Sequence, residues 1–61
     1  MTTTQVTTAM KNLNRNEKFR LLDKALSSAS ASTVWFVERF VRYGIIEGLS
    51  QSVSSEIAAF L

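Results

Sequence analysis

Two glycines, Gly44 and Gly48, stand in the closing stretch "RYGIIEGLSQSVSSEIAAFL" and constrain the fold more than any other feature of the chain. If one helix ran through both, the apolar residues after them would point away from Phe36 and Phe40, on the side that carries the charged residues. This later apolar stripe consists of Leu49, Val53, Ile57 and Phe60. One core cannot contact both sides of a rod, and a glycine inside a helix costs about 1 kcal/mol relative to alanine. We therefore expect a turn between Gly44 and Ser50.

The same glycines also fit an unbroken helix, which is the alternative. Small and β-branched residues recur at spacings of three and four from Val34 to Ala59, and Gly44 and Gly48 belong to this seam. Such a seam would allow a second helix to approach closely. The stripe that begins at Leu49 would then need another partner, so the turn is the preferred interpretation and the continuous helix stays open.

The segment "TVWFVERFVRY" before the glycines is rich in β-branched and aromatic residues, which favour a strand by propensity. In a strand, however, charged residues would interrupt both faces. In a helix, the apolar residues gather on one half, with Phe36 and Phe40 at its centre, and the charged residues on the other. We predict a helix over residues 33–44, capped by Ser32 or Thr33.

Two further helices are predicted, over residues 14–28 and 49–61. Asn14 is a good N-cap, and Glu17 completes the pattern of a capping box. The expected inner face of the first helix is Phe19, Leu22, Leu26 and Ala29, flanked by Leu21 and Ala25. We thus expect an all-α fold, a small helical hairpin or three-helix arrangement, in which residues 1–13 are a flexible Thr-rich segment and residues 14–61 a single small domain.

A chain of 61 residues has a thin core, and this one is 46% hydrophobic, more than a small monomer hides easily. It contains no Cys and no His, which excludes disulfides and leaves only carboxylates as metal ligands. Because small folds depend on disulfides, metals or association, we expect this fold to be completed by oligomerisation or by a larger partner.

The sequence offers little for enzymatic chemistry. There is no His to act as a base or to activate a hydroxyl, Asp23 is the only Asp, and the Glu residues are scattered. We predict no catalytic, cofactor-binding or metal-binding residues. The formal charge of +2 is too small to indicate nucleic acid by itself, no apolar run could span a bilayer, and the first residues lack the pattern of a signal peptide. A cytoplasmic location is therefore expected.

Trp35 is the residue that most suggests binding, because the helical projection places it among the charged residues Glu38, Arg39 and Arg42 instead of in the core. Trp and Arg dominate binding hot spots. Arg39 can stack on the indole from the next turn, and Glu38 can pair with Arg42. A structural alternative is that Trp35 packs under the N-terminal segment or against a second copy.

Two features of the sequence make nucleic-acid binding an alternative function. Residues 11–24 carry five bases against Glu17 and Asp23, but the bases spread around the helix, and a solvated amphipathic face is the preferred explanation. The stretch "GLSQSVSSEI" resembles the turn and second helix of helix-turn-helix DNA-binding proteins. The resemblance rests on Gly44, Gly48, Leu49, Ser50, Gln51, Ser52 and Ile57. It departs at Glu47 and Ser54, where apolar residues are expected, and the helix that would read DNA has no Arg or Lys.

The preferred function is that of a non-enzymatic interaction protein, such as an inhibitor, adaptor or assembly subunit, that binds a protein partner or itself. Trp35, Glu38, Arg39 and Arg42 are the predicted partner-binding residues. The alternatives are a small DNA-binding regulator that uses residues 44–61, as the resemblance implies, and a structural subunit of a polymeric assembly.

Overall fold

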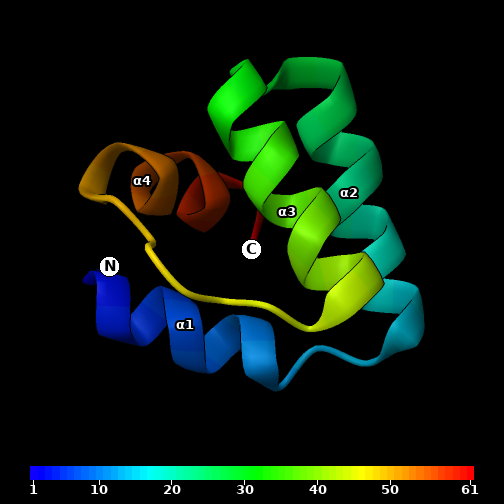
Figure 1. Cartoon of the computed structure of the whole chain (residues 1–61), viewed down its shortest axis with the longest axis horizontal. Helices are drawn as coiled ribbons and strands as arrows, with labels where there is room; N and C mark the ends of the chain where they lie inside the picture. Colours follow the sequence, from blue (N-terminus) through cyan, green and yellow to red (C-terminus); the bar gives the residue numbers. More distant parts are fainter.

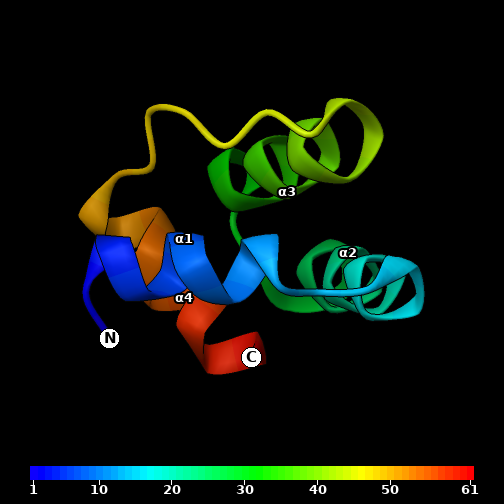
Figure 2. The same cartoon turned by 90° about the horizontal axis from the view of Figure 1, so that it is seen from below.

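The computed structural model describes all 61 residues and contains four α helices and no strand, which confirms the expected all-α fold. The helices are α1 (Thr3–Lys11), α2 (Arg15–Ser28), α3 (Ala31–Tyr43) and α4 (Gln51–Phe60). Helices α2 and α3 form a hairpin on one side of the molecule, while α1 and α4 pack together on the other (Figures 1 and 2). None of the four helices combines the length and apolar character that crossing a membrane requires.

The N-terminal segment differs from the expectation, because residues 3–11 form the regular helix α1 instead of a loose segment. The Thr2 hydroxyl accepts a hydrogen bond from the Gln5 N–H, and the Gln5 side chain accepts one from the Thr2 N–H, which makes a capping box. On the inner face of α1, Val6 and Met10 are completely buried. Threonine is a weak helix former, but packing of these two side chains stabilises the helix despite its composition.

The starts of α2 and α3 are capped in different ways. Asn14 and Glu17 form the predicted capping box, with both hydrogen bonds 2.9 Å long. Helix α3 begins earlier than expected, after Ser30, whose side chain makes no cap hydrogen bond. Thr33, one of the two expected caps, is instead fully buried inside the first turn of α3.

The predicted turn lies where the glycines are. Gly44 ends α3 in the left-handed conformation, with φ at 71°, and Gly48 has φ at 74° in the linker to α4. Side chains with a Cβ rarely adopt this conformation, so glycine is the favoured residue at both positions. Residues 44–50 are not helical, which contradicts the alternative of one continuous helix.

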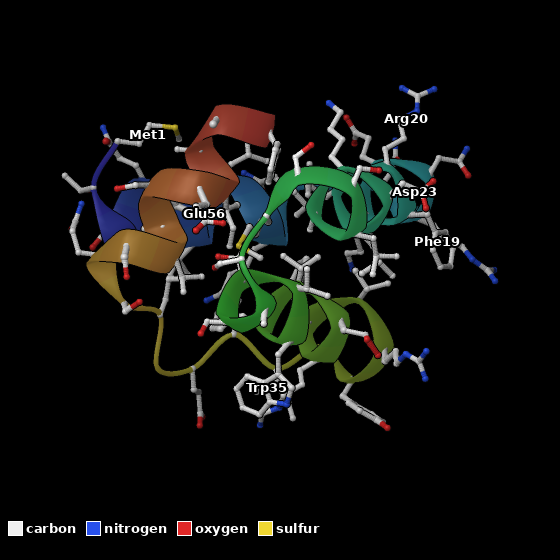
Figure 3. The ribbon with its side chains drawn as sticks, turned by 90° about the horizontal axis from the view of Figure 1, so that it is seen from above. Met1, Phe19, Arg20, Asp23, Trp35 and Glu56 are labelled. Atoms are coloured by element: carbon white, nitrogen blue, oxygen red, sulfur yellow. The ribbon has the colours of Figure 1, made fainter.

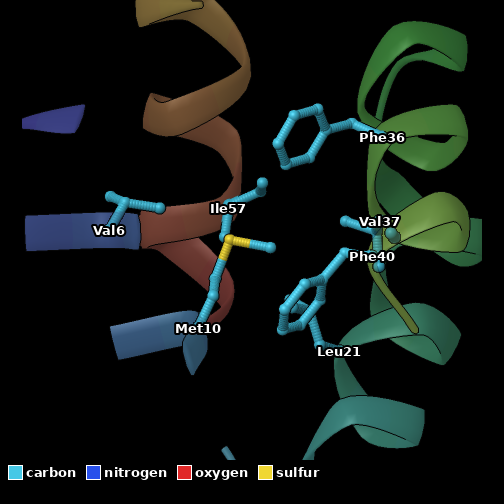
Figure 4. Packing of buried hydrophobic residues seen from close by; sticks show 8 residues of the cluster. Val6, Met10, Leu21, Phe36, Val37, Phe40 and Ile57 are labelled. Carbon is cyan, nitrogen blue, oxygen red and sulfur yellow. The ribbon is translucent and has the colours of Figure 1, made fainter. Parts of the chain in front are cut away.

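All four helices contribute to the core, which is completed by partly buried residues such as Leu49, Val53 and Phe60. Figure 4 shows the packing of its buried hydrophobic residues, which are Val6, Met10, Leu21, Ala25, Phe36, Val37, Phe40 and Ile57. The two apolar stripes on either side of the glycines therefore do face one core, as the turn requires. Two polar residues, Thr33 and Ser54, are also fully buried, and the Ser54 hydroxyl has no hydrogen-bond partner.

The inner face of α2 differs from the prediction. Leu21 and Ala25, which were expected at its edge, are the buried residues of this helix. Phe19 and Leu26, which were expected at its centre, are 47% and 61% exposed. The helix is thus rotated relative to the expected orientation, with Leu22 half-buried between the two sides.

Candidate functional site

Trp35 lies on the outer side of α3 and is 60% exposed, although it is the largest apolar side chain of the protein. It points away from the ribbon in Figure 3. The Arg39 guanidinium lies 4.5 Å from the centre of the indole ring, one helical turn further on. This is the cation–π stacking predicted from the sequence, and it limits the freedom of both side chains. Trp35 does not pack under the N-terminal segment.

Glu38 and Arg42 form an exposed ion pair on the same helix, with 3.6 Å between the Glu38 carboxylate and the Arg42 guanidinium. An exposed pair of this kind contributes at most about 1 kcal/mol. Its effect is on position: Glu38 orients Arg42, whereas Arg39 is held by the indole of Trp35. The four predicted partner-binding residues therefore lie on one helix as two separate side-chain pairs.

A shallow groove of about 450 Å³ adjoins Trp35, between the first turns of α3 and the start of α4. It is lined by Ala31, Ser32, Trp35, Phe36, Gly48, Ser50 and Val53. Gly48 thus lies in the wall of the groove, while Gly44 is not among its lining residues. The sequence did not predict the groove, because its two walls come from segments separated by the linker and only their packing creates it.

A hydrogen bond holds the two helices beside the groove together. The Glu56 carboxylate on α4 accepts a 2.9 Å hydrogen bond from the Ser30 N–H at the start of α3. Hydrogen bonds from the Ser30 backbone and side chain lower the pKa of Glu56 below its ordinary value, because they stabilise the charged form. Sequence analysis missed this contact, since the two residues lie far apart in the chain.

The remaining predicted features are not brought together into a chemical site. No group of three or more acidic side chains is arranged to hold a metal ion. The helix-turn-helix resemblance requires Gly44 inside the first helix, but Gly44 ends α3 and an irregular linker follows it. Helix α4 carries no base. The end of α3 at Gly44 and the irregular linker are thus further departures from the helix-turn-helix pattern, in addition to Glu47 and Ser54 in the sequence.

Two bases in the first turn of α2, the exposed Arg15 and the half-buried Lys18, lie beside aromatic rings. The Arg15 guanidinium lies 5.8 Å from the ring centre of Phe19, and the Lys18 ammonium lies 5.2 Å from that of Phe40.

Comparisons of the chain with protein-family models, with curated proteins and with solved structures find no match.

Proposed function

We propose that this protein is a non-enzymatic interaction protein that binds a protein partner through the Trp35 surface, defined as Trp35, Glu38, Arg39, Arg42 and the adjoining groove. The observation that carries this proposal is the exposure of Trp35, which is 60% accessible while Arg39 stacks on its ring. Covering a large aromatic side chain is favourable by roughly 25 cal/mol for each Å² of apolar area removed from water. A partner that covers the indole gains this free energy directly.

The arrangement of Trp35 and Arg39 favours tight contact for a second reason. Immobilising a flexible side chain on binding costs about 0.5–1.5 kcal/mol. Because the indole and the guanidinium already restrict each other at 4.5 Å, part of this ordering is present before the partner arrives. The groove beside them has Phe36 and Val53 in its walls and suits an apolar side chain of the partner.

The charges of the surface indicate what should lie next to that apolar side chain. Glu38 is paired with Arg42, which leaves the Arg39 charge without a carboxylate partner in the chain. A carboxylate on the partner, close to an aliphatic or aromatic side chain, would complement this arrangement. Such a contact fits an inhibitor, an adaptor or an assembly subunit.

The test is capture of a partner by the immobilised protein, with Trp35→Ala and Tyr43→Ala as matched variants. Both aromatic residues lie on α3 and are exposed, Tyr43 to 72%, but only Trp35 adjoins the groove. Once the captured protein is purified, we expect Trp35→Ala to weaken its affinity by about 30-fold or more and Tyr43→Ala to change it little. Calorimetric titration measures the affinities, and circular dichroism checks that each variant is folded.

Two outcomes would contradict the proposal. One is equal affinity of wild type and Trp35→Ala for the captured partner. The other is a loss of binding that accompanies a loss of helicity, which would show that Trp35 stabilises the folded protein instead of contacting the partner. The salt dependence of binding distinguishes this function from nucleic-acid binding. Affinity for an apolar protein surface changes little between 50 and 200 mM salt, whereas affinity that depends on several phosphate contacts falls by about 1,000-fold over the same range.

A further inference from the structure

Helix α2 carries a second apolar face that the fold leaves uncovered. Phe19, Leu22 and Leu26 follow one another at spacings of three and four, so they form one stripe along the helix. Phe19 is 47% exposed, Leu26 is 61% exposed and Leu22 is half-buried. Helices α3 and α4 pack against the other side of α2, where Leu21 and Ala25 are buried. Figure 3 shows Phe19 at the outer edge of the molecule.

Apart from the capping residue Glu17, the charges at the two ends of α2 do not complement its dipole. Arg15 and Lys18 lie in the first turn, near the positive end of the helix, and no base lies in the last turn. At that last turn the Ser30 N–H, which could have continued the helical hydrogen bonds, goes to Glu56 instead. The carbonyl groups of Leu26, Ser27 and Ser28 therefore accept no hydrogen bond within the chain.

From the exposed stripe and these charges together, we propose that α2 binds α2 of a second copy of this chain in an antiparallel, two-fold arrangement. In this arrangement Phe19 of each copy covers Leu26 of the other, and the two Leu22 side chains meet near the axis. The first turn of one α2 then lies beside the last turn of the other. Each Arg15 can donate to the free carbonyl groups at the end of the opposite helix, where a cation is favourable.

The flank of the stripe is also self-complementary. Arg20 and Asp23 lie on the same side of α2, as Figure 3 shows, and neither forms an ion pair within the chain. An antiparallel second copy brings Arg20 of one chain close to Asp23 of the other, and the symmetry forms this pair twice. A parallel pairing would instead place Arg15 beside Arg15 and leave both helix ends without complementary charges.

The first experiment measures mass against concentration by analytical ultracentrifugation, with variants chosen to be harmless to the single chain. Wild type should reach twice its 6.8 kDa chain mass as concentration rises. Leu26→Asp should raise the dissociation constant about 100-fold or more, because each dimer loses two buried leucines and gains two charges. Asn16→Asp adds the same charge to an exposed position of α2 outside the stripe and should leave the dimer intact.

Orientation is tested with single cysteines, since the chain has none of its own. Near the proposed axis, Asp23→Cys should form a disulfide between copies under oxidation. Asn16→Cys should not, because antiparallel pairing separates the two copies of this position by roughly 20 Å. A disulfide from Asn16→Cys would contradict the antiparallel arrangement.

Several outcomes would overturn the dimer: wild type that stays monomeric at every concentration, a dimer that Leu26→Asp leaves unchanged, or disulfides from both cysteine variants. Trp35→Ala keeps this test separate from the proposed function. It should weaken binding of the captured partner by about 30-fold or more, while the dimer forms with an unchanged dissociation constant. A dimer that is lost in Trp35→Ala and kept in Leu26→Asp would show that the copies meet through the Trp35 surface instead.

Discussion

Helices α2 and α3 pack against each other, yet only the buried face of α3 could be predicted from the sequence. In α3 the charged residues Glu38, Arg39 and Arg42 occupy one side, and the opposite side, with Phe36 and Phe40, is buried. In α2 the charges are spread around the helix and apolar residues lie on two adjacent sides. The comparison teaches that a buried face is marked less by its apolar residues than by where the charges are absent.

The sharpest test of this comparison uses two leucines of α2 that differ in burial. Leu21→Ala should lower the free energy of unfolding by about 2–5 kcal/mol, because Leu21 is only 3% exposed and its loss leaves a cavity. Leu26→Ala, at a position 61% exposed, should change it by about 0.5 kcal/mol or less in dilute solution. Urea unfolding followed by circular dichroism measures both, and the reverse order would show that the orientation expected from the sequence is correct.

A second test concerns the end of α3. Gly44→Ala should lower the free energy of unfolding by about 1–2 kcal/mol, because alanine is strained at a φ of 71°. Apart from the adjoining residues, no atom lies within 4 Å of the added Cβ, so a steric clash does not contribute to the loss. Gly44→Asn is the matched control and should lose less, since asparagine tolerates this conformation. Equal losses in thermal unfolding would point away from backbone conformation as the cause.

The smallest expected effect is at the hydrogen bond that joins α4 to the start of α3. Because the pKa of Glu56 is lowered in the folded protein, the bond stabilises the fold above the ordinary glutamate pKa of about 4.3 and is lost as pH falls through the lowered value. Glu56→Gln should therefore reduce the melting temperature slightly at pH 7 and also reduce its fall at acid pH. Glu47→Gln removes the same charge from the linker, where Glu47 makes no hydrogen bond, and should do neither.

Local signals were sufficient where the physical cause is local. The start of α2 at Asn14 and the end of α3 at Gly44 were both predicted, since each depends on hydrogen bonds or φ angles within a few residues. Helix α1 was missed although it carries such signals: Thr2 and Gln5 have the spacing of a capping box, and Val6 and Met10 lie one turn apart. The threonine content outweighed them in the sequence analysis, because the packing of α1 against α4 does not appear in propensity.

Some features of the candidate site could likewise be predicted from the sequence, and others could not. Stacking of Arg39 on Trp35 and pairing of Arg42 with Glu38 follow from spacing along one helix, and both were predicted. The groove beside Trp35 and the contact between Glu56 and Ser30 join α3 to α4. Their partners lie far apart in the chain, and the path of the linker decides that they meet.

The sequence by itself determined that the chain is helical, and it favoured an end of α3 at the first glycine and one core shared by the apolar residues before and after the turn, although it left a continuous helix open. Caps, glycine conformation and charge segregation depend on residues within one or two helical turns, so they can be predicted from neighbouring positions in the sequence. Only the tertiary structure decided that the N-terminal residues form a helix, which side of α2 is buried, and where the groove lies. These depend on which surfaces compete for a core too small to cover every apolar side chain.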